Sequence, residues 1–379
     1  MGGFQGDLSD ATCAELGAAA IRAAVERAGV APEDIDEVLM GCVLPAGQGQ
    51  APARQAALGG GLPLGVPCST LNKMCGSGMK TTMIAMDQLR AGNGMVVLAG
   101  GMESMSNAPY VLPKMRGGAR LGHAGAMDHM FLDGLEDAYD KGRLMGTFAE
   151  DCAEKYQFSR EAQDEYALRS LDCALSAQNE GRFADEIAAV TLSTRKGDVT
   201  VSEDEQPRKA RPDKIPTLKP AFKKDGTVTP ANASSISDGA AALVLMRESD
   251  AKAKGLKIRG RLMAHGSHAQ EPGWFTTAPV PAMQTVLDRM GWAVGDVDLW
   301  EVNEAFAVVP MAAEQEIGMP RERLNVNGGA CALGHPIGAS GTRIIVTLLH
   351  ALEKSGGKRG IASLCIGGGE GTAVALEID

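Results

Sequence analysis

The feature that most constrains the fold of this chain is an internal repeat with a spacing of about 260 residues. The string Gly29-x-Ala31-x-x-Asp34-Ile35-Asp36 returns 262 residues later as Gly291-x-Ala293-x-x-Asp296-Val297-Asp298. A glycine-bounded turn ahead of a helix occurs at residues 75–78 and again at 335–341. An apolar strand runs into Gly-Gly-Met-Glu at 100–103 and another into Gly-Gly-Gly-Glu at 367–370. Three elements in the same order predict two similar halves packed together.

Each half has the pattern of an α/β protein. Helical spacing covers residues 10–28, and short apolar strands are predicted at 38–43 and 95–99, with glycines at the corners. The 48 glycines and 4% aromatic residues favour this class over a helical bundle. We expect an N-terminal half of residues 1–106 plus 237–258 and a C-terminal half of residues 259–379.

Residues 107–236 have no counterpart in the repeat and predict an inserted loop domain. A helix is predicted over 156–182 and exposed loops over 195–230. Loops inserted over a rigid scaffold commonly cover and select a ligand.

Composition excludes several classes of function. The chain has 379 residues and a formal net charge of −10, which argues against non-specific binding to nucleic acid or anionic membranes. It has no apolar run of about 18 residues and no basic-then-apolar leader at its start. The eight cysteines are scattered without a Cys-x-x-Cys pair, and no histidine stands at metal-ligand spacing from them. These features predict a cytoplasmic protein without disulfides, bound metal, or nucleic-acid and membrane partners.

Cys75 is the first candidate catalytic residue. It stands in Leu-Asn-Lys-Met-Cys-Gly-Ser-Gly-Met-Lys, residues 71–80, just before a predicted amphipathic helix. Unpaired N–H groups at a helix N-terminus favour a thiolate, and small neighbours let a substrate approach. The alternative is a small buried cysteine that fills a loop-to-helix corner.

His335 occupies the position in the second half that Cys75 occupies in the first. If the halves face one another about a pseudo-twofold axis, the two side chains converge, and the imidazole takes the thiol proton to leave a thiolate at neutral pH. The other histidines are more typical of hydrogen-bonded loop residues.

Two further positions end predicted strands. Cys365 precedes three glycines, and Gly367 and its neighbours are suited to direct N–H groups at an oxyanion. Asn303 lies where a strand gives way to a helix. The alternatives are a buried strand cysteine for Cys365 and a helix N-cap for Asn303.

Taken together, these motifs resemble those of a thiolase along essentially the whole chain. The resemblance rests on Asn72-Lys73-Met74-Cys75-Gly76-Ser77-Gly78, Asn303-Glu304-Ala305-Phe306, Gly328-Gly329-x-x-x-x-Gly334-His335-Pro336-x-Gly338-x-Ser340-Gly341 and Cys365-Ile366-Gly367-Gly368-Gly369-x-Gly371. It implies the five-layered thiolase fold, with two duplicated βαβαβ halves and an inserted loop domain, assembled as a homodimer or homotetramer.

The resemblance also implies ping-pong acyl transfer, the Claisen condensation of two acetyl-CoA molecules and the reverse thiolysis. Cys75 would attack the thioester with His335 as its base, and the N–H groups of Cys75 and Gly367 would stabilise the oxyanion. Cys365 would take the α-proton of the second substrate, while His335 and a water held by Asn303 support the enolate. Coenzyme A thioesters would be substrates, and no permanently bound cofactor is expected.

Contacts to coenzyme A follow from the same resemblance. Ser234 would touch the pantetheine, Met145 and Phe306 would line its tunnel, and Arg208 would lie near the adenine or phosphates. Lys209, Arg211 and Lys214 would add positive charge at the mouth. Leu144 stands where many biosynthetic thiolases carry a histidine, which leaves chain-length preference open.

The family also has an apolar strand before the Gly-x-Phe-x-Gly that matches residues 2–6, and this sequence begins after it. We therefore expect the N-terminal half to lack a central strand, at a cost of about 1–3 kcal/mol for each buried unpaired group, and a form extended upstream to be more stable.

Other functions remain as alternatives. They are a degradative 3-ketoacyl-CoA thiolase of broader chain length and a non-catalytic acyl-CoA-binding subunit. A β-ketoacyl-carrier-protein synthase is disfavoured by Cys365, because those enzymes use two histidines. A phosphate loop at 76–81 is disfavoured because Met79 stands where glycine is required.

Overall fold

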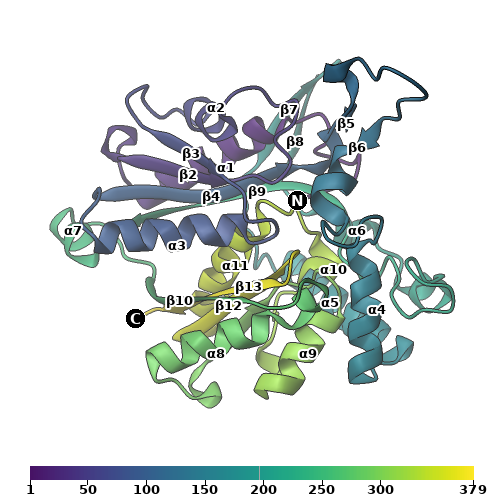
Figure 1. The fold of residues 1–379 in the computed structure, drawn as a ribbon. Helices are drawn as coiled ribbons and strands as arrows, with labels where there is room; N and C mark the ends of the chain where they lie inside the picture. Colours follow the sequence, from purple (N-terminus) through teal and green to yellow (C-terminus); the bar gives the residue numbers. More distant parts are fainter. Residues whose placement is uncertain (196) are drawn as a thin grey trace.

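The computed structural model describes residues 1–195 and 197–379, and its main strands form two mixed sheets with helices between and outside them (Figure 1). The first sheet has the order β1-β9-β4-β2-β3, with β1 Gly2–Gly3, β2 Glu37–Gly41, β3 Cys68–Leu71, β4 Val96–Ser104 and β9 Ser237–Met246. The second has the order β10-β13-β12-β11, with β10 Arg261–Ala269, β11 Leu299–Val302, β12 Arg359–Ile366 and β13 Glu370–Glu377.

The helices form three layers around these sheets (Figure 1). The outer face of the first sheet carries α1 (Cys13–Ala28) and α2 (Pro52–Gly59), and that of the second carries α8 (Pro279–Met290) and α9 (Val308–Ile317). Between the sheets, α3 (Ser77–Arg90) packs against α11 (Ser340–Ser355). The helices that follow the Cys75 and His335 turns therefore meet at the centre of the molecule.

Glycine allows α3 and α11 to approach closely. A Cβ at Gly341 would lie 2.3 Å from the backbone nitrogen of Met79, and one at Gly78 would lie 2.7 Å from Oγ1 of Thr342. The Thr342 hydroxyl instead donates a hydrogen bond to the Gly78 carbonyl at 2.8 Å. A larger residue at either glycine would push the two helices apart.

The two sheets repeat one strand pattern. In the first, β4 is parallel to β2 and antiparallel to β9, and in the second β12 is parallel to β11 and antiparallel to β13. Beyond β9 and β13 lie β1 and β10, both antiparallel to their neighbours, but β1 has 2 residues and β10 has 9. We expected the N-terminal half to lack a central strand. The position given in that expectation is wrong, because β1 lies at the edge of its sheet.

A groove of about 690 Å³ lies along β9, between α1, α11 and β10. In the register of β1, which pairs Gly2 with Asp238 and Gly3 with Ser237, residues ahead of β1 would run along β9 from Gly239 onwards. None of the five predicted catalytic residues lines this groove.

Residues 107–236 contain more regular structure than a loop domain. They include hairpins β5–β6 (Tyr110–Val111 and Met127–Asp128) and β7–β8 (Val190–Thr194 and Gly197–Val201), a π-helical turn Phe131–Leu135, and helices α4 (Met145–Tyr156), α5 (Arg160–Asn179) and α6 (Glu205–Lys209). The helix predicted over 156–182 is α5. It begins only at Arg160, because Gln157 is left-handed (φ 57°) and the Ser159 hydroxyl caps the helix by accepting from Ala162 N–H. Two short helices complete the fold, α7 (Glu248–Ala253) and α10 (Ala330–Leu333).

Local sequence explains the first long helix. Thr12 and Glu15 form a capping box, Gly29 ends the helix in a left-handed conformation, and buried side chains recur along one face. Across the described part of the chain, no helix combines the length and apolar character that crossing a bilayer requires.

Candidate active site

Cys75 lies in a strained turn directly ahead of α3, as predicted. Met74 has a φ of 47°, which a non-glycine residue adopts only when its surroundings hold it there. Its N–H donates to Oδ1 of Asn72 at 2.8 Å, and the Ser77 hydroxyl donates to its carbonyl at 2.6 Å. These bonds leave Cys75 half-buried at the helix N-terminus.

The Cys75 thiol is protonated at neutral pH. Burial raises its pKa to about 11, although hydrogen bonds from the Gly367 N–H and from its own N–H act in the opposite direction. The charge of Glu103 raises the pKa further. Desolvation thus outweighs the two N–H groups directed at the sulfur and opposes the resting thiolate that the sequence predicts.

Cys365 lies next to this thiol, near the end of β12. It is 1% exposed, and burial, followed by the proximity of Cys75, raises its pKa well above the usual value for cysteine. The turn after it needs glycine: Gly368 and Gly369 have φ of 95° and 87°, and a Cβ at Gly369 would lie 2.4 Å from the Gln270 carbonyl oxygen. This turn brings the Gly367 N–H to the Cys75 sulfur.

An ion pair between Lys73 and Glu370 joins the turns that carry Cys75 and Gly367. Lys73 is two residues before Cys75, and Glu370 is three residues after Gly367. The pair links the two halves of the chain beside the thiol.

His335 is buried as a neutral imidazole with a free basic nitrogen. Its Nδ1 lies 2.6 Å from the Ser340 hydroxyl, which itself donates to the Pro336 carbonyl at 3.0 Å. The hydroxyl must therefore accept from Nδ1–H, which leaves the lone pair on Nε2. Nε2 is buried and has no hydrogen-bond partner among the described residues. Burial, assisted by the charge of Arg343, lowers the pKa of His335 to about 3.

Asn303 directly follows β11, and its N–H donates to the Ser363 carbonyl at 2.9 Å. Ser363 lies on β12, two residues before Cys365. It is 1% exposed, and neither atom of its side-chain amide has a hydrogen-bond partner within the described chain. The N-cap alternative is wrong, because α9 begins at Val308 with Ala307 as its N-cap. A buried, unpaired amide is suited to hold a polar group of a ligand.

The two parts of the chain match two family models, described as "Thiolase, N-terminal domain" over residues 1–249 and "Thiolase, C-terminal domain" over residues 256–378. The chain belongs to the thiolase family.

Named thiolase relatives align over the entire chain. An acetyl-CoA acetyltransferase of Pseudomonas aeruginosa is 49% identical over 381 residues, covering 100% of this chain and 97% of that protein. An acetyl-CoA acetyltransferase of Cupriavidus necator is 50% identical, with coverage of 100% and 96%. The crystal structure of the Bacillus anthracis acetyl-CoA acetyltransferase matches with a TM-score of 0.96 at 42% identity, covering 99% of this chain and 95% of that one.

Of the residues that the thiolase resemblance assigned to the pantetheine, Met145 lies beside the Gly367 turn. The Phe306 ring packs edge-to-face on Phe222 with centroids 6.0 Å apart, and Ser234 donates from both N–H and hydroxyl to the Ala305 carbonyl at 3.0 Å. The Met145 sulfur lies 3.5 Å from where a Cβ of Gly367 would be. Leu144 is the residue directly before α4. Their contacts to coenzyme A remain predictions.

The basic mouth predicted for this thiolase is partly neutralised within the chain. Arg208 forms an ion pair with Asp7, and Lys209 pairs with both Asp7 and Glu205. A role of Arg208 at the adenine or phosphates would require it to exchange or share the Asp7 carboxylate.

Sequence reasoning missed the buried groups that hold this thiolase site in place. Glu304, next to Asn303, accepts from the Tyr166 hydroxyl at 3.2 Å, the Ser170 hydroxyl at 2.7 Å and the Asn325 amide at 2.8 Å. Ser340, which fixes the tautomer of His335, was also missed. The sequence feature that could have pointed to Glu304 and Ser340 was an acidic or hydroxyl residue inside an otherwise apolar motif.

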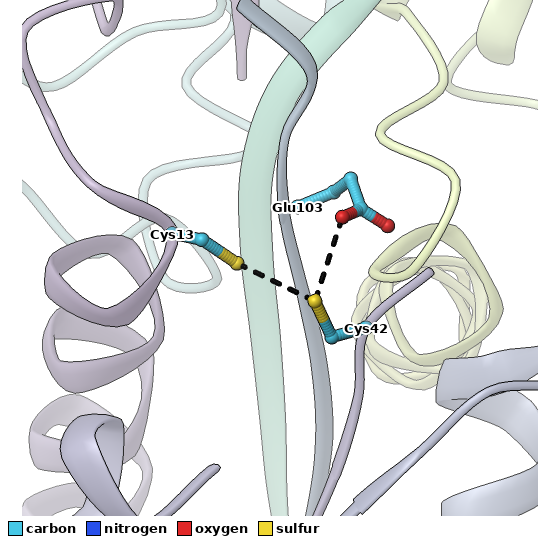
Figure 2. A group of neighbouring side chains, drawn as sticks. All are labelled: Cys13, Cys42 and Glu103. Atoms are coloured by element: carbon cyan, nitrogen blue, oxygen red, sulfur yellow. Dashed lines mark hydrogen bonds between the residues drawn. The ribbon is translucent and has the colours of Figure 1, made fainter. Parts of the chain in front are cut away.

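A second missed group contains Cys13, Cys42 and Glu103, and Figure 2 shows the three side chains directed toward one another. The sulfurs of Cys13 and Cys42 are 4.0 Å apart, and the Cys42 thiol donates to Oε1 of Glu103 at 3.6 Å. One ligand atom from each residue lies within 4.8 Å of the others, which is close enough for a metal ion. The sequence did not reveal this group, because α1, β4 and the segment after β2 bring together residues that are far apart in sequence, and the expected absence of a bound metal stays a prediction. All eight cysteines are free thiols.

Proposed function

We propose that this thiolase-family chain is an acetyl-CoA C-acetyltransferase, which joins two acetyl-CoA molecules into acetoacetyl-CoA and catalyses the reverse thiolysis. The observation that carries the proposal is a thiol with two backbone N–H groups directed at its sulfur, adjacent to a second buried thiol. Full-length relatives at 49% and 50% identity, which are named acetyl-CoA acetyltransferases, support the choice of substrate.

In the first half-reaction, the Cys75 sulfur attacks the thioester carbonyl carbon of acetyl-CoA as its proton moves to Nε2 of His335. The N–H groups of Cys75 and Gly367 stabilise the oxyanion. The carbon–sulfur bond to coenzyme A then breaks, and Cys365 donates its proton to the departing sulfur. An acetyl group remains on Cys75, and Cys365 becomes a thiolate.

In the second half-reaction, the Cys365 thiolate takes the α-proton of another acetyl-CoA. The resulting carbanion attacks the acetyl carbon on Cys75, while His335 and the amide of Asn303 face the enolate oxygen. The bond to Cys75 breaks, and His335 returns its proton to that sulfur. Each side chain ends in its starting protonation state, and the product is acetoacetyl-CoA.

The proposal extends to architecture and assembly. The repeated strand pattern supports two halves related by duplication, separated by an inserted domain at residues 107–236. Substrates are coenzyme A thioesters. A homodimer or homotetramer remains our prediction for the assembly.

The test separates the two half-reactions. With acetyl-CoA, Cys365→Ala should still acetylate Cys75, more slowly than wild type, and release about one equivalent of coenzyme A per chain without forming acetoacetyl-CoA. Cys75→Ala should do neither. Normal acetoacetyl-CoA synthesis by either variant would contradict the assignment.

Chain length is tested by thiolysis of acetoacetyl-CoA and longer 3-ketoacyl-CoA substrates. Apolar residues crowd the Cys75 side of the site, among them Leu44, Met130 and Ile337. We expect the highest kcat/KM with acetoacetyl-CoA. A clear preference for long chains would favour the degradative alternative.

A further inference from the structure

Glu103, the penultimate residue of β4, is a fully buried carboxylate that the proposed chemistry does not use. We propose that Glu103 is a positioning residue for acyl transfer, whose carboxylate fixes the loop that carries His335 and restrains the reactivity of Cys75. The inference rests on the proposed transferase activity.

Hydrogen bonds from two separate segments converge on this carboxylate. After β2, the N–H of Val43 donates to Oε2 at 2.9 Å and the N–H of Leu44 donates to Oε1 at 3.1 Å. From the C-terminal half, the N–H of Gly338 also donates to Glu103. A buried carboxylate with several N–H donors stays in one orientation, because any rotation would leave donors unpaired.

The bond to Gly338 connects Glu103 to the imidazole. Gly338 is three residues after His335, in the same short turn before α11. A Cβ at Gly338 would lie 2.6 Å from Oε2 of Glu103, so the backbone of this loop rests directly on the carboxylate. Within the loop, Ala339 N–H donates to the Pro336 carbonyl at 2.9 Å. Movement of the carboxylate would therefore displace the turn that orients His335.

Burial raises the pKa of Glu103 to about 7, so this carboxylate is ionised over the alkaline range in which Cys75 titrates and acts on that thiol through its charge. It is among the groups that raise the pKa of Cys75, after burial. The titratable groups near Glu103 are Cys42, Cys13 and Cys75, and Cys365 lies near Cys75. Loss of the charge should make Cys75 easier to ionise while its base loses its position.

The contacts favour a hydrogen-bonded carboxylate over a metal site in this cluster. Both oxygens of Glu103 already accept N–H donors, and Oε1 also accepts the Cys42 thiol. The pKa of Cys13 is raised well above its usual range, first by its contact with Cys42 and then by burial, so its sulfur holds its proton.

The experiment compares Glu103→Gln with wild type in two assays. We expect kcat for acetoacetyl-CoA synthesis to fall about 10- to 100-fold, with KM changed less than about threefold, because orientation is lost but substrate contacts remain. In a separate assay, the pH midpoint for iodoacetamide alkylation of Cys75 should move to lower pH. A purely structural role would not make the thiol more acidic.

Cys13→Ala is the matched control, because Cys13 belongs to the same buried cluster but its sulfur meets that of Cys42 at 4.0 Å, and no hydrogen bond joins it to Glu103 or Gly338 among the described residues. It should keep kcat within about twofold of wild type. An equal loss of turnover in Cys13→Ala and Glu103→Gln would overturn the inference, because it would point to general packing.

Circular dichroism shows whether Glu103→Gln folds. If it does not fold, a second variant tests the inference. Glu103→Asp keeps the charge but withdraws it from Gly338, so kcat should fall while the alkylation midpoint moves less than in the glutamine variant. Wild-type kcat in whichever of these variants folds overturns the inference. Absence of turnover in the wild-type chain overturns the proposed function instead.

Discussion

At the scale of single residues, burial decides the protonation states in this site. The thiol of Cys75 has its pKa raised to about 11, and the imidazole of His335 has its pKa lowered to about 3. Both groups are neutral near pH 7, so no resting thiolate–imidazolium pair forms. In the proposed mechanism, the thiolate therefore forms only as the thioester is attacked.

This balance predicts a pH dependence. A group with a raised pKa ionises late, so alkylation of Cys75 by iodoacetamide should keep rising from pH 7 to above pH 10. The rate is measured by loss of the free Cys75 peptide in mass spectrometry. A plateau already complete at pH 8 would show that the thiolate is the resting species.

The sequence predicted the candidate reactive residues but not their charge states. Cys75, His335 and Cys365 could be found because each lies in a glycine-rich motif at the end of a strand or the start of a helix. Their desolvation comes from side chains on other elements, and the opposing N–H group of Gly367 comes from the other half of the chain. Local sequence does not contain that information.

At the scale of elements, the site depends on turns held against one another. The turn before α3 carries Cys75, the turn after β12 carries Gly367, and the Lys73–Glu370 ion pair connects them. The sequence predicted both turns from their glycines. It could not predict the ion pair, because the partners are 297 residues apart.

We predict that Lys73→Ala and Glu370→Ala each lower kcat about tenfold, since a small displacement of the Gly367 N–H weakens oxyanion stabilisation. The double variant should be little worse than either single variant. Arg261→Ala is a suitable control. Arg261 lies on β10 and forms an ion pair with Glu248, whose two side chains are 26% and 39% exposed, similar to the 21% and 37% of the Lys73–Glu370 pair. Additive losses from the two single variants would contradict the coupling.

The edge of the first sheet gives a second prediction at this scale. An apolar strand of about six residues fused ahead of Met1 should pair with β9, fill the groove and raise the melting temperature by several degrees. A Gly/Ser extension of equal length is the control, because it also removes the ion pair of the Met1 amino group with Asp204. Equal melting temperatures for the two extensions would refute the prediction.

At the scale of the whole molecule, the contact of α3 with α11 joins the helices that follow the Cys75 and His335 turns, which we propose carry the nucleophile and its base. We predict that Gly341→Ala destabilises the chain by about 1–3 kcal/mol in urea unfolding and also lowers kcat, because the new methyl would meet the Met79 backbone. Gly295→Ala is the matched control, since nothing lies within 4 Å of its Cβ position. Loss of stability without loss of turnover would mean that the helix contact does not position the site.

The sequence predicted this overall arrangement better than its details. The repeat of residues 29–36 at 291–298 indicated two halves, and the order β1-β9-β4-β2 in the first sheet corresponds to β10-β13-β12-β11 in the second. The regular structure within residues 107–236 was underestimated, because short hairpins such as β7–β8 gain their stability from pairing and not from local composition. The buried contacts of Glu103 and Glu304 were invisible because their partners come from distant segments.

In the proposed mechanism, acetyl-CoA acylates Cys75 beside Gly367, His335 and Cys365. The most direct measurement is a crystal structure of the protein soaked with acetyl-CoA. We predict an acetyl group on Cys75 Sγ, with its carbonyl oxygen accepting hydrogen bonds from the N–H groups of Cys75 and Gly367, and with Cys365 and His335 facing it. An acetyl group on another side chain, or a carbonyl oxygen directed away from both N–H groups, would contradict the account.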